Sequence, residues 1–281
     1  MKLNQNTISK IGKELQSLVK GEVLFDEFSR GRYSADASIY QITPIGIVIP
    51  KDTDDVLRVL EYCTLNELPI LPRGAGSSQC GQTVGECVVL DYSKFQNQIL
   101  HIDLNEKTAW VQPGLVLDQL NEKLKQYDLC FPVDVSTSSR ATIGGMTGNN
   151  SCGSRSLYYG NMVHNVEAVE AILDDGSLYT FENINKDYLI TKNNQNRQYK
   201  IIEELIEIYQ NNKQEINDNF PKTQRRVGGY NLDLINPNGF NTSNILVGSE
   251  GTLSLFNKVK LKLSPIPVSY THLTLPTIYS V

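Results

Sequence analysis

Residues 72–78 read Pro72-Arg73-Gly74-Ala75-Gly76-Ser77-Ser78 and continue a short predicted strand over 69–72. Residues this small cannot fill a core, but they let the backbone approach a ligand and turn N–H groups toward an anion such as a pyrophosphate. A tight loop between strands also needs glycine for its geometry alone, so this loop by itself leaves both interpretations open. A Rossmann NAD site is not expected, because Gln79 stands where its third glycine would be.

Two further small-residue segments follow in the second half of the chain. One loop within residues 136–153 reads Thr142-Ile143-Gly144-Gly145-Met146-Thr147-Gly148-Asn149-Asn150-Ser151-Cys152-Gly153, and its amides and hydroxyls can hydrogen-bond a ring edge or a phosphate. The other reads Val247-Gly248-Ser249-Glu250-Gly251-Thr252-Leu253; taken alone it is equally consistent with a surface turn that carries a solvated glutamate. Three such segments in one chain favour an extended ligand held between two lobes.

Hydrophobic periodicity around these loops indicates a mixture of helices and strands. Apolar residues at helical spacing predict helices over 7–19, 56–65, 116–127 and 201–219. Apolar runs predict strands over 45–49, 69–72, 88–91, 244–248 and 252–263, and hairpins over 99–112 and 166–181. This order predicts an α+β fold with an N-terminal helical extension over 1–40 and two lobes, about 41–130 and 131–267.

Composition excludes several classes of protein. The 281 residues are 40% hydrophobic and carry a net charge of -5 without a dense Lys/Arg stripe, so no nucleic-acid partner is expected. No apolar run of about 18 residues appears and the N-terminus is polar, which predicts a cytoplasmic protein without a transmembrane segment, or one held peripherally at the inner face of the membrane. The odd set Cys63, Cys80, Cys87, Cys130 and Cys152 contains no Cys-x-x-Cys pair, so we expect reduced thiols and no metal site.

The three small-residue segments, in this order, resemble the FAD-binding domain of the vanillyl-alcohol oxidase type, also called the PCMH type. Its members include glycolate oxidase, D-lactate dehydrogenase and D-2-hydroxyglutarate dehydrogenase, and the resemblance extends from about residue 28 to 267. Two further segments resemble the subgroup that carries an iron–sulfur domain later in the chain. They read Gly31-Arg32-Tyr33-Ser34-Ala35-Asp36-Ala37-Ser38-Ile39-Tyr40 and Arg225-Arg226-Val227-Gly228-Gly229-Tyr230-Asn231-Leu232.

The resemblance implies a two-lobed α+β PCMH-type domain over 41–267 with FAD between the lobes. Its pyrophosphate would lie on the first loop, and the second and third loops would reach the ring system. The implied cofactor-binding residues are Pro72, Arg73, Gly74, Ala75, Gly76, Ser77, Ser78, Pro132, Thr137, Thr142, Gly144, Gly145, Asn149, Ser151, Glu250 and Gly251. Ser77 stands where flavin-tethering relatives have a histidine, which implies non-covalent FAD.

The resemblance also implies the reaction. In relatives a hydride leaves C2 of a 2-hydroxy acid for the flavin, a histidine takes the hydroxyl proton, and an arginine holds the carboxylate. None of His101, His164 and His272 matches that histidine, so the catalytic base is unknown and is expected beyond the end of this chain. Arg225 and Arg226 are candidates to face the substrate, although adjacent arginines are also typical of a solvated face.

The last residues of the chain depart from the family pattern. From Val268 the sequence reads Ser269-Tyr270-Thr271-His272-Leu273-Thr274-Leu275-Pro276-Thr277, where the family would enter its substrate-cap domain. This peptide resembles one reading frame of a transposase adapter used in DNA library preparation. We therefore expect residues 268–281 to be non-native, and the chain to be an N-terminal fragment whose substrate-cap domain is missing.

These observations predict the FAD-binding portion of an oxidoreductase that oxidises a D-2-hydroxy acid such as D-lactate or D-2-hydroxyglutarate. An iron–sulfur cluster is expected only in a longer parent protein, and the electron acceptor is undetermined. Two alternatives stay open: a flavin-binding module without turnover of its own, and a sugar-nucleotide reductase that uses NADPH on the same scaffold.

Overall fold

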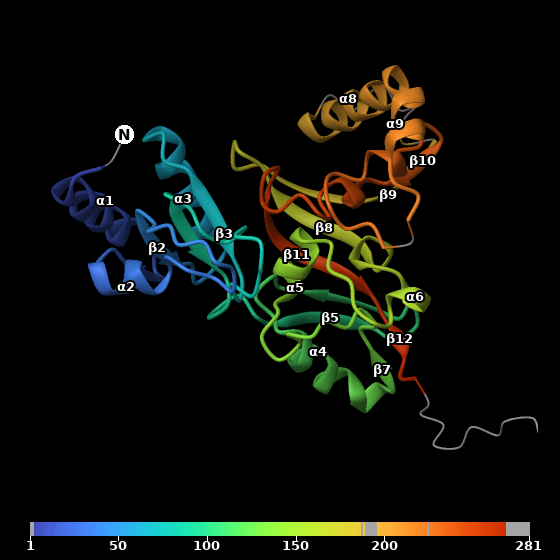
Figure 1. The fold of residues 1–281 in the computed structure, drawn as a ribbon, viewed down its shortest axis with the longest axis horizontal. Coiled ribbons are helices and arrows are strands. Elements are labelled where there is room, and N and C mark those ends of the chain that lie inside the picture. Colours follow the sequence, from blue (N-terminus) through green and yellow to red (C-terminus); the bar gives the residue numbers. More distant parts are fainter. Residues whose placement is uncertain (1–2, 187, 189–195, 224, 268–281) are drawn as a thin grey trace, which may run out of the picture.

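The computed structural model describes residues 3–186, 188, 196–223 and 225–267, which form two lobes, each built on its own sheet (Figure 1). The first lobe contains a four-stranded sheet in the order β1-β2-β4-β3. Its strands are β1 (Glu22–Leu24), β2 (Gly46–Ile49), β3 (Ile70–Arg73) and β4 (Val88–Asp91), and its helices are α1 (Gln5–Leu18), α2 (Glu27–Arg32) and α3 (Thr53–Leu65). β4 pairs in parallel with both β2 and β3, and α3 connects β2 to β3.

Apolar side chains on both faces hold the first sheet. Val48, Val88 and Leu90 pack with residues of α1 and α3 on one face, while Ile47 and Val89 form a smaller cluster on the other. Strands buried on both faces read as continuous apolar runs, which is why periodicity identified β2 and β4 from the sequence.

The second lobe contains a six-stranded antiparallel sheet in the order β10-β9-β8-β11-β6-β5. Its strands are β5 (Ile99–Asp103), β6 (Thr108–Val111), β8 (Val166–Ile172), β9 (Leu178–Asn185), β10 (Gly239–Asn241) and β11 (Leu255–Lys262). The helices of this lobe are α4 (Leu117–Leu124), α5 (Ile143–Gly148), α6 (Ser156–Tyr159), α8 (Arg197–Asn211) and α9 (Lys213–Asn219). Four 3-10 turns are η1 (Lys125–Tyr127), η2 (Met162–His164), η3 (Leu232–Leu234) and η4 (Thr242–Ile245), and a small second sheet pairs β7 (Leu129–Cys130) with β12 (Ser264–Pro265).

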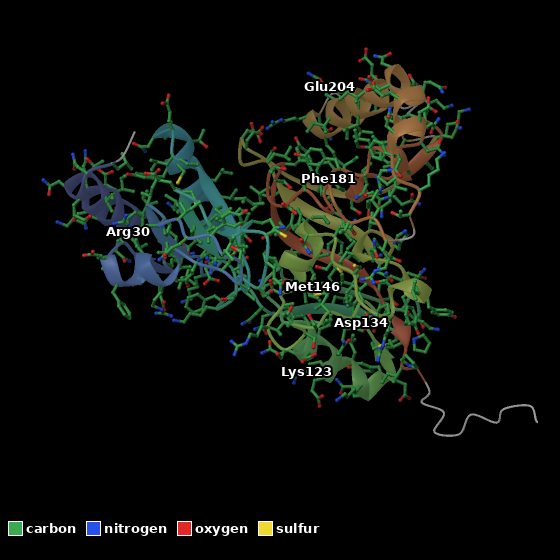
Figure 2. All side chains as sticks on the ribbon, in the orientation of Figure 1. Arg30, Lys123, Asp134, Met146, Phe181 and Glu204 are labelled. Atoms are coloured by element: carbon green, nitrogen blue, oxygen red, sulfur yellow. The ribbon has the colours of Figure 1, made fainter. Side chains whose placement is uncertain are left out.

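Contacts between the lobes are both apolar and polar. Ile172 and Leu255, at the ends of β8 and β11, pack into the apolar cluster of the first lobe. The Thr53 hydroxyl at the start of α3 donates to Asn257 Oδ1 of β11 at 2.7 Å. Met146 lies near the centre of the molecule, while charged side chains such as Lys123 and Glu204 lie on its outside (Figure 2).

The division between the lobes falls earlier than the predicted boundary near residue 130. β6 pairs antiparallel with β11, for example at Val111 and Val259, so the hairpin of β5 and β6 belongs to the second sheet. The chain therefore leaves the first sheet after Asp91 and enters the second at Ile99. This pairing partner lies about 150 residues further along the chain, beyond the reach of local periodicity.

Three local predictions were wrong. Residues 244–248 are not a strand, because the Asn241 side chain accepts from Ser243 N at 3.0 Å and starts the turn η4. The predicted helix 201–219 is two helices that meet at Asn212. The loop predicted over 136–153 contains a helical turn, α5, whose N-cap is Thr142.

The helices α1, α3 and α4 and the two hairpins lie where the sequence predicted them. All five cysteines are free: Cys63, Cys87 and Cys130 are buried, Cys152 is half-buried and Cys80 is exposed. Among the helices that the structure describes, none is long and apolar enough to cross a bilayer. Residues 268–281 lie outside the described residues, and their non-native origin stays a prediction that amplification from source DNA would test.

Candidate functional site

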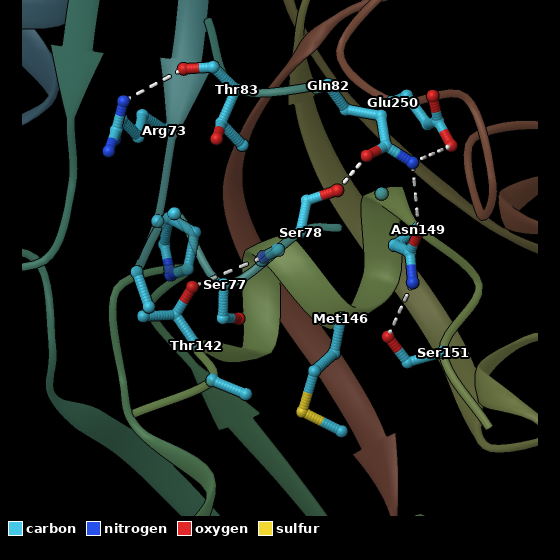
Figure 3. A pocket seen from close by; sticks show the side chains of 18 of the residues that line it. Arg73, Ser77, Ser78, Gln82, Thr83, Thr142, Met146, Asn149, Ser151 and Glu250 are labelled. Atoms are coloured by element: carbon cyan, nitrogen blue, oxygen red, sulfur yellow. Dashed lines mark hydrogen bonds between the residues drawn. The ribbon is translucent and has the colours of Figure 1, made fainter. Parts of the chain in front are cut away.

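A cavity of about 330 Å³ lies between the two lobes, and the three small-residue segments meet there (Figure 3). This volume falls within the range of small-molecule sites. Every predicted cofactor-binding residue except Pro132 lines it. Those that line it are Pro72, Arg73, Gly74, Ala75, Gly76, Ser77, Ser78, Thr137, Thr142, Gly144, Gly145, Asn149, Ser151, Glu250 and Gly251. Pro132 is buried and is not among the lining residues.

The first loop, residues 73–78, is supported by the side chain of its own arginine. The Arg73 guanidinium donates to the carbonyl oxygens of Tyr33, Thr83 and Ala35 at 3.1, 2.9 and 2.8 Å and lies 5.2 Å from the centre of the Tyr33 ring. Burial lowers the pKa of Arg73, although nearby carboxylates oppose this effect. A Cβ atom on Gly76, whose φ is +63°, would lie 2.5 Å from Arg73 Nη2. The guanidinium is therefore a scaffold for the loop, whose backbone is left to meet a ligand.

The second segment contributes α5, which packs tightly against its neighbours. Thr142 caps the helix by accepting from Gly145 N at 3.4 Å. A Cβ atom on Gly74 would lie 2.1 Å from Thr142 Oγ1, and one on Gly144 would lie 2.6 Å from Pro113 Cβ. Glycine at residues 74 and 144 thus allows the first loop and residue 113 to contact α5.

The third segment, residues 248–251, is a turn that rests on the end of α5. Gly248 N donates to Thr147 O, and Glu250 N donates to Gly148 O, both at 3.0 Å. Gly248 and Gly251 have φ values of +86° and +77°, and Glu250 adopts +52°, which is uncommon for a residue with a side chain. The turn presents the Glu250 carboxylate at the cavity, beside the first loop.

Several lining residues carried no recognisable signal in the sequence. Gln82 follows the first loop, and its side-chain Nε2 lies 3.2 Å from Glu250 Oε1. Tyr92 follows β4 and Ser254 precedes β11; both line the cavity, and within the described residues neither hydroxyl has a hydrogen-bond partner. Burial raises the pKa of Tyr92, so its hydroxyl stays a neutral donor. A buried polar atom without a partner is uncommon, and here it indicates that the cavity wall suits a polar ligand or ordered water.

The structure separates the two arginines that were candidates to face a substrate. Arg226 donates to Asp233 Oδ1 at 2.6 Å and to Asn231 Oδ1 at 3.2 Å, and its guanidinium lies 5.0 Å from the Phe220 ring centre. Arg225 is exposed and donates to Sγ of Cys152, a cavity-lining residue, at 3.1 Å. This contact raises the pKa of Arg225. Of these two arginines, Arg225 contacts a cavity-lining residue and pairs with no carboxylate within the described residues, whereas Arg226 is paired with Asp233.

His101 and His164 do not contribute to the cavity wall. His101 lies on β5, at the edge of the second sheet, and His164 Nδ1 accepts from Asn161 N at 3.0 Å in the turn η2. Neither is among the residues that line the cavity. His272 lies outside the described residues.

Comparison with known proteins agrees with this geometry. The family described as FAD binding domain matches residues 44–182, which include the first two loops. Residues 44–182 belong to this FAD-binding domain family. The α+β fold and the family resemblance expected from the sequence are thereby confirmed.

Similar proteins extend the match over most of the chain. D-2-hydroxyglutarate dehydrogenase of Escherichia coli K12 is 32% identical over 241 residues, which are 83% of this chain and 24% of that protein. Glycolate oxidase subunit GlcD of Bacillus subtilis 168 is 32% identical over 266 residues, 92% of this chain and 46% of that protein. The chain thus spans about a quarter of the length of the D-2-hydroxyglutarate dehydrogenases that it matches.

Solved structures share the architecture at low sequence identity. Alkyldihydroxyacetonephosphate synthase superposes with a TM-score of 0.65 at 19% identity, over 93% of this chain and 41% of that one. 6-Hydroxy-D-nicotine oxidase from Arthrobacter nicotinovorans gives a TM-score of 0.59 at 15% identity, over 88% of this chain and 43% of that one. At such identities the likeness shows the fold alone.

The residues of the FAD-binding domain fit a dinucleotide. Three features converge on one cavity from both lobes: a glycine backbone that a Cβ atom would obstruct, the capped helix α5, and two hydroxyls that have no partner in the described part of the chain. A ligand with polar groups along its length would be able to hydrogen-bond the hydroxyls of Tyr92 and Ser254 and the backbone of the first loop together.

Proposed function

We propose that this chain carries the FAD site of a flavin-dependent enzyme that oxidises a D-2-hydroxy acid. The observation that carries the proposal is the convergence of the three loops, 73–78, 142–153 and 248–251, on one cavity. The similarity to a D-2-hydroxyglutarate dehydrogenase and a glycolate oxidase subunit supports the substrate class.

Different segments of the cavity would bind different parts of FAD. The backbone of residues 74–78 would hold the pyrophosphate, and Thr142, Asn149 and Ser151 would reach the ring system. Bound FAD would supply the hydride acceptor for C2 of the substrate. Ser77 offers a hydroxyl where a histidine tether would be needed, so we propose non-covalent binding.

Arg225 is our candidate for the substrate carboxylate. Its present partner is the Cys152 sulfur, a weaker acceptor than a carboxylate, whereas Arg226 already pairs with Asp233. We propose that the base that takes the hydroxyl proton, and any iron–sulfur cluster, belong to other parts of a longer protein. The electron acceptor is not assigned.

The decisive experiment mixes the purified chain with FAD, removes free FAD by gel filtration and records the visible spectrum before and after acid precipitation. Flavin that co-elutes with the protein and then moves wholly into the acid supernatant is the expected result. A protein with the circular dichroism of a folded α+β chain that retains no FAD would contradict the proposal.

The substrate class is tested on the full-length protein that contains this domain. D-Lactate and D-2-hydroxyglutarate should bleach the flavin. Among variants that keep their FAD, Arg225→Gln should raise the substrate concentration needed for half-maximal bleaching more than Arg226→Gln does. Bleaching by NADPH in place of the hydroxy acids would favour the sugar-nucleotide reductase.

A further inference from the structure

Gln82 connects the two lobes at the cavity. It belongs to the first lobe, four residues after the end of the first loop, and its carboxamide points toward the second lobe (Figure 3). Its Nε2 lies 3.2 Å from Glu250 Oε1 and 3.5 Å from Asn149 Oδ1. Its Oε1 accepts a hydrogen bond from Ser78 of the first loop. One side chain thus joins the first loop to two loops of the second lobe.

The turn that carries Glu250 contacts both lobes through its backbone. Two backbone hydrogen bonds to the end of α5, from Gly248 N and Glu250 N, hold it to the second lobe. Gly251 packs on the first lobe so closely that a Cβ atom there would lie 2.6 Å from Pro72 Cγ. The Glu250 carboxylate is therefore held opposite Gln82 by a backbone with little freedom to move.

Charge decides what Glu250 can bind. The pyrophosphate of a dinucleotide is anionic, so a carboxylate at the cavity repels it and cannot serve as its ligand. The neutral Gln82 amide supplies a donor that the carboxylate needs and adds no positive charge that would compete for the phosphates. Glu250 stays a predicted cofactor-binding residue near the ring system, and its partner in the structure is Gln82.

We propose that Gln82 and Glu250 form a clasp that joins the two lobes across the cavity and slows the release of bound FAD. Gln82 is a positioning residue in this scheme, because it acts by holding loops 73–78 and 248–251 together. The proposal rests on the proposed FAD site, and it adds a residue that the family resemblance did not supply.

The first measurement is the dissociation rate of FAD, followed by the rise in flavin fluorescence after dilution of the complex to a concentration far below its Kd. Gln82→Ala should release FAD about three- to tenfold faster, as expected for the loss of one hydrogen bond to a charged acceptor. Gln82→Glu should release FAD faster than Gln82→Ala does because like charges then face each other. Gln82→Lys is tested in the FAD-free protein below, because its charge would also attract the phosphates of FAD.

A matched control separates the clasp from a general effect of losing a glutamine. Gln214 on α9 also donates to a carboxylate, Asp218 Oδ2, at 2.8 Å, but it lies outside the cavity wall. Gln214→Ala should leave the FAD dissociation rate unchanged. A double-mutant cycle with Gln82→Ala and Glu250→Ala should show that the second substitution adds little to the first.

A second measurement uses the FAD-free protein, so it does not depend on the proposed function. Backbone amide hydrogen exchange in segments 74–78 and 248–251 should be faster in Gln82→Ala than in wild type, slow again in Gln82→Lys, and unchanged in Gln214→Ala. Failure of wild type to bind FAD would overturn the proposed function, while the exchange rates would still decide whether the clasp exists. Exchange unchanged by Gln82→Ala, or FAD released more slowly by that variant, overturns the clasp.

Discussion

Arg73 and Arg226 show how one side chain at a cavity becomes part of the scaffold. Each guanidinium has five N–H donors, and each hydrogen-bonds within its own lobe. Arg73 donates to three backbone carbonyls, and Arg226 donates to Asp233 and Asn231. Arg225 makes one contact to a thiol. The residue type alone is the same in all three, so only the partners separate a structural arginine from one that is available to an anion.

A substitution at Gly74 tests whether the first loop requires a residue without a side chain at this position. Gly74→Ala places a Cβ atom 2.1 Å from Thr142 Oγ1, so the first loop must move away from the cap of α5. We expect at least tenfold weaker FAD binding and a loss of about 1–3 kcal/mol of folding free energy. Fluorescence titration and urea unfolding measure both effects.

Gly31 supplies the control for that substitution. It lies within α2, and a Cβ atom there meets nothing within 4 Å. Gly31→Ala should therefore leave FAD affinity unchanged and stabilise the helix by about 0.5–1 kcal/mol. Equal FAD affinity for Gly74→Ala and wild type would show that the loop does not need this close approach.

The cysteines of the first lobe should differ sharply in reactivity. Burial raises the pKa of Cys63 and Cys87 to about 12, whereas Cys80 is exposed. Iodoacetamide at pH 8 should therefore alkylate Cys80 well before Cys63 or Cys87, because the thiolate is the nucleophile. Peptide mass spectrometry over time measures the order, and prompt labelling of Cys63 in folded protein would contradict it.

The same two thiols predict a dependence of stability on alkaline pH. Their pKa in the folded state lies above that in the unfolded state, so the folded chain holds these protons more tightly. The resulting stability is complete below the unfolded-state pKa of about 8.5 and is lost as the pH rises from there toward about 12. Cys63→Ala/Cys87→Ala should flatten this loss in urea unfolding between pH 9 and about 11 relative to wild type; an unchanged slope would argue against it.

At the scale of elements, α3 is anchored by a carboxylate inside the fold. Asp55 is fully buried and accepts backbone N–H groups of Lys20, Gly21 and Lys51 at 2.8, 2.9 and 2.8 Å. These bonds join the end of α1, the entry to β1 and the turn after β2 to one helix. The first lobe therefore depends on one side chain for the relative position of its elements.

Removing this anchor should destabilise the first lobe strongly. Asp55→Ala leaves three buried or half-buried N–H groups without partners, and we expect a loss of about 3 kcal/mol in the free energy of unfolding. Asp54→Ala is the control, since Asp54 is exposed and lies 3.8 Å from the Lys20 ammonium; it should change stability by less than about 0.5 kcal/mol. Similar urea midpoints for the two variants would contradict the role of Asp55.

At the scale of the whole molecule, the cavity exists only where the two sheets meet. Its wall takes loops from both lobes, and the apolar contacts of Ile172 and Leu255 with the first lobe hold the sheets in place. A ligand that touches both walls binds only the assembled molecule. Binding and the association of the lobes are therefore thermodynamically linked.

This linkage predicts that FAD protects both lobes together. At about 100 times its Kd, FAD should stabilise the folded protein by about 2.7 kcal/mol and slow amide exchange in loop 73–78 and in α5 alike. Thermal unfolding and exchange mass spectrometry, with AMP as a ligand that offers only half of the dinucleotide, provide the measurement. Protection confined to one lobe would mean that the cofactor does not bridge the cavity.

The sequence by itself determined the features that depend on neighbours along the chain. Periodicity located α1, α3 and α4, turn residues located both hairpins, and the glycine-rich segments contain more than half of the residues that line the cavity. Asn212 and Asn241 show the limit of this reasoning, because a single capping side chain ended one helix and turned a supposed strand into η4. Helical and strand preferences extend over a few residues and cannot anticipate which hydrogen bond a capping side chain will make.

Only the tertiary structure decided which distant segments meet. β6 pairs with a strand about 150 residues away, and this pairing places the boundary between the lobes earlier than predicted. Gln82 contacts Glu250, which lies 168 residues further along the chain. It also decided that Arg226 pairs with Asp233, and that the hydroxyls of Tyr92 and Ser254 at the cavity wall have no partner among the residues that the structure describes. The physical reason is that these contacts follow from the packing of two separate sheets, whose relative position is set by burial of apolar surface from the whole chain.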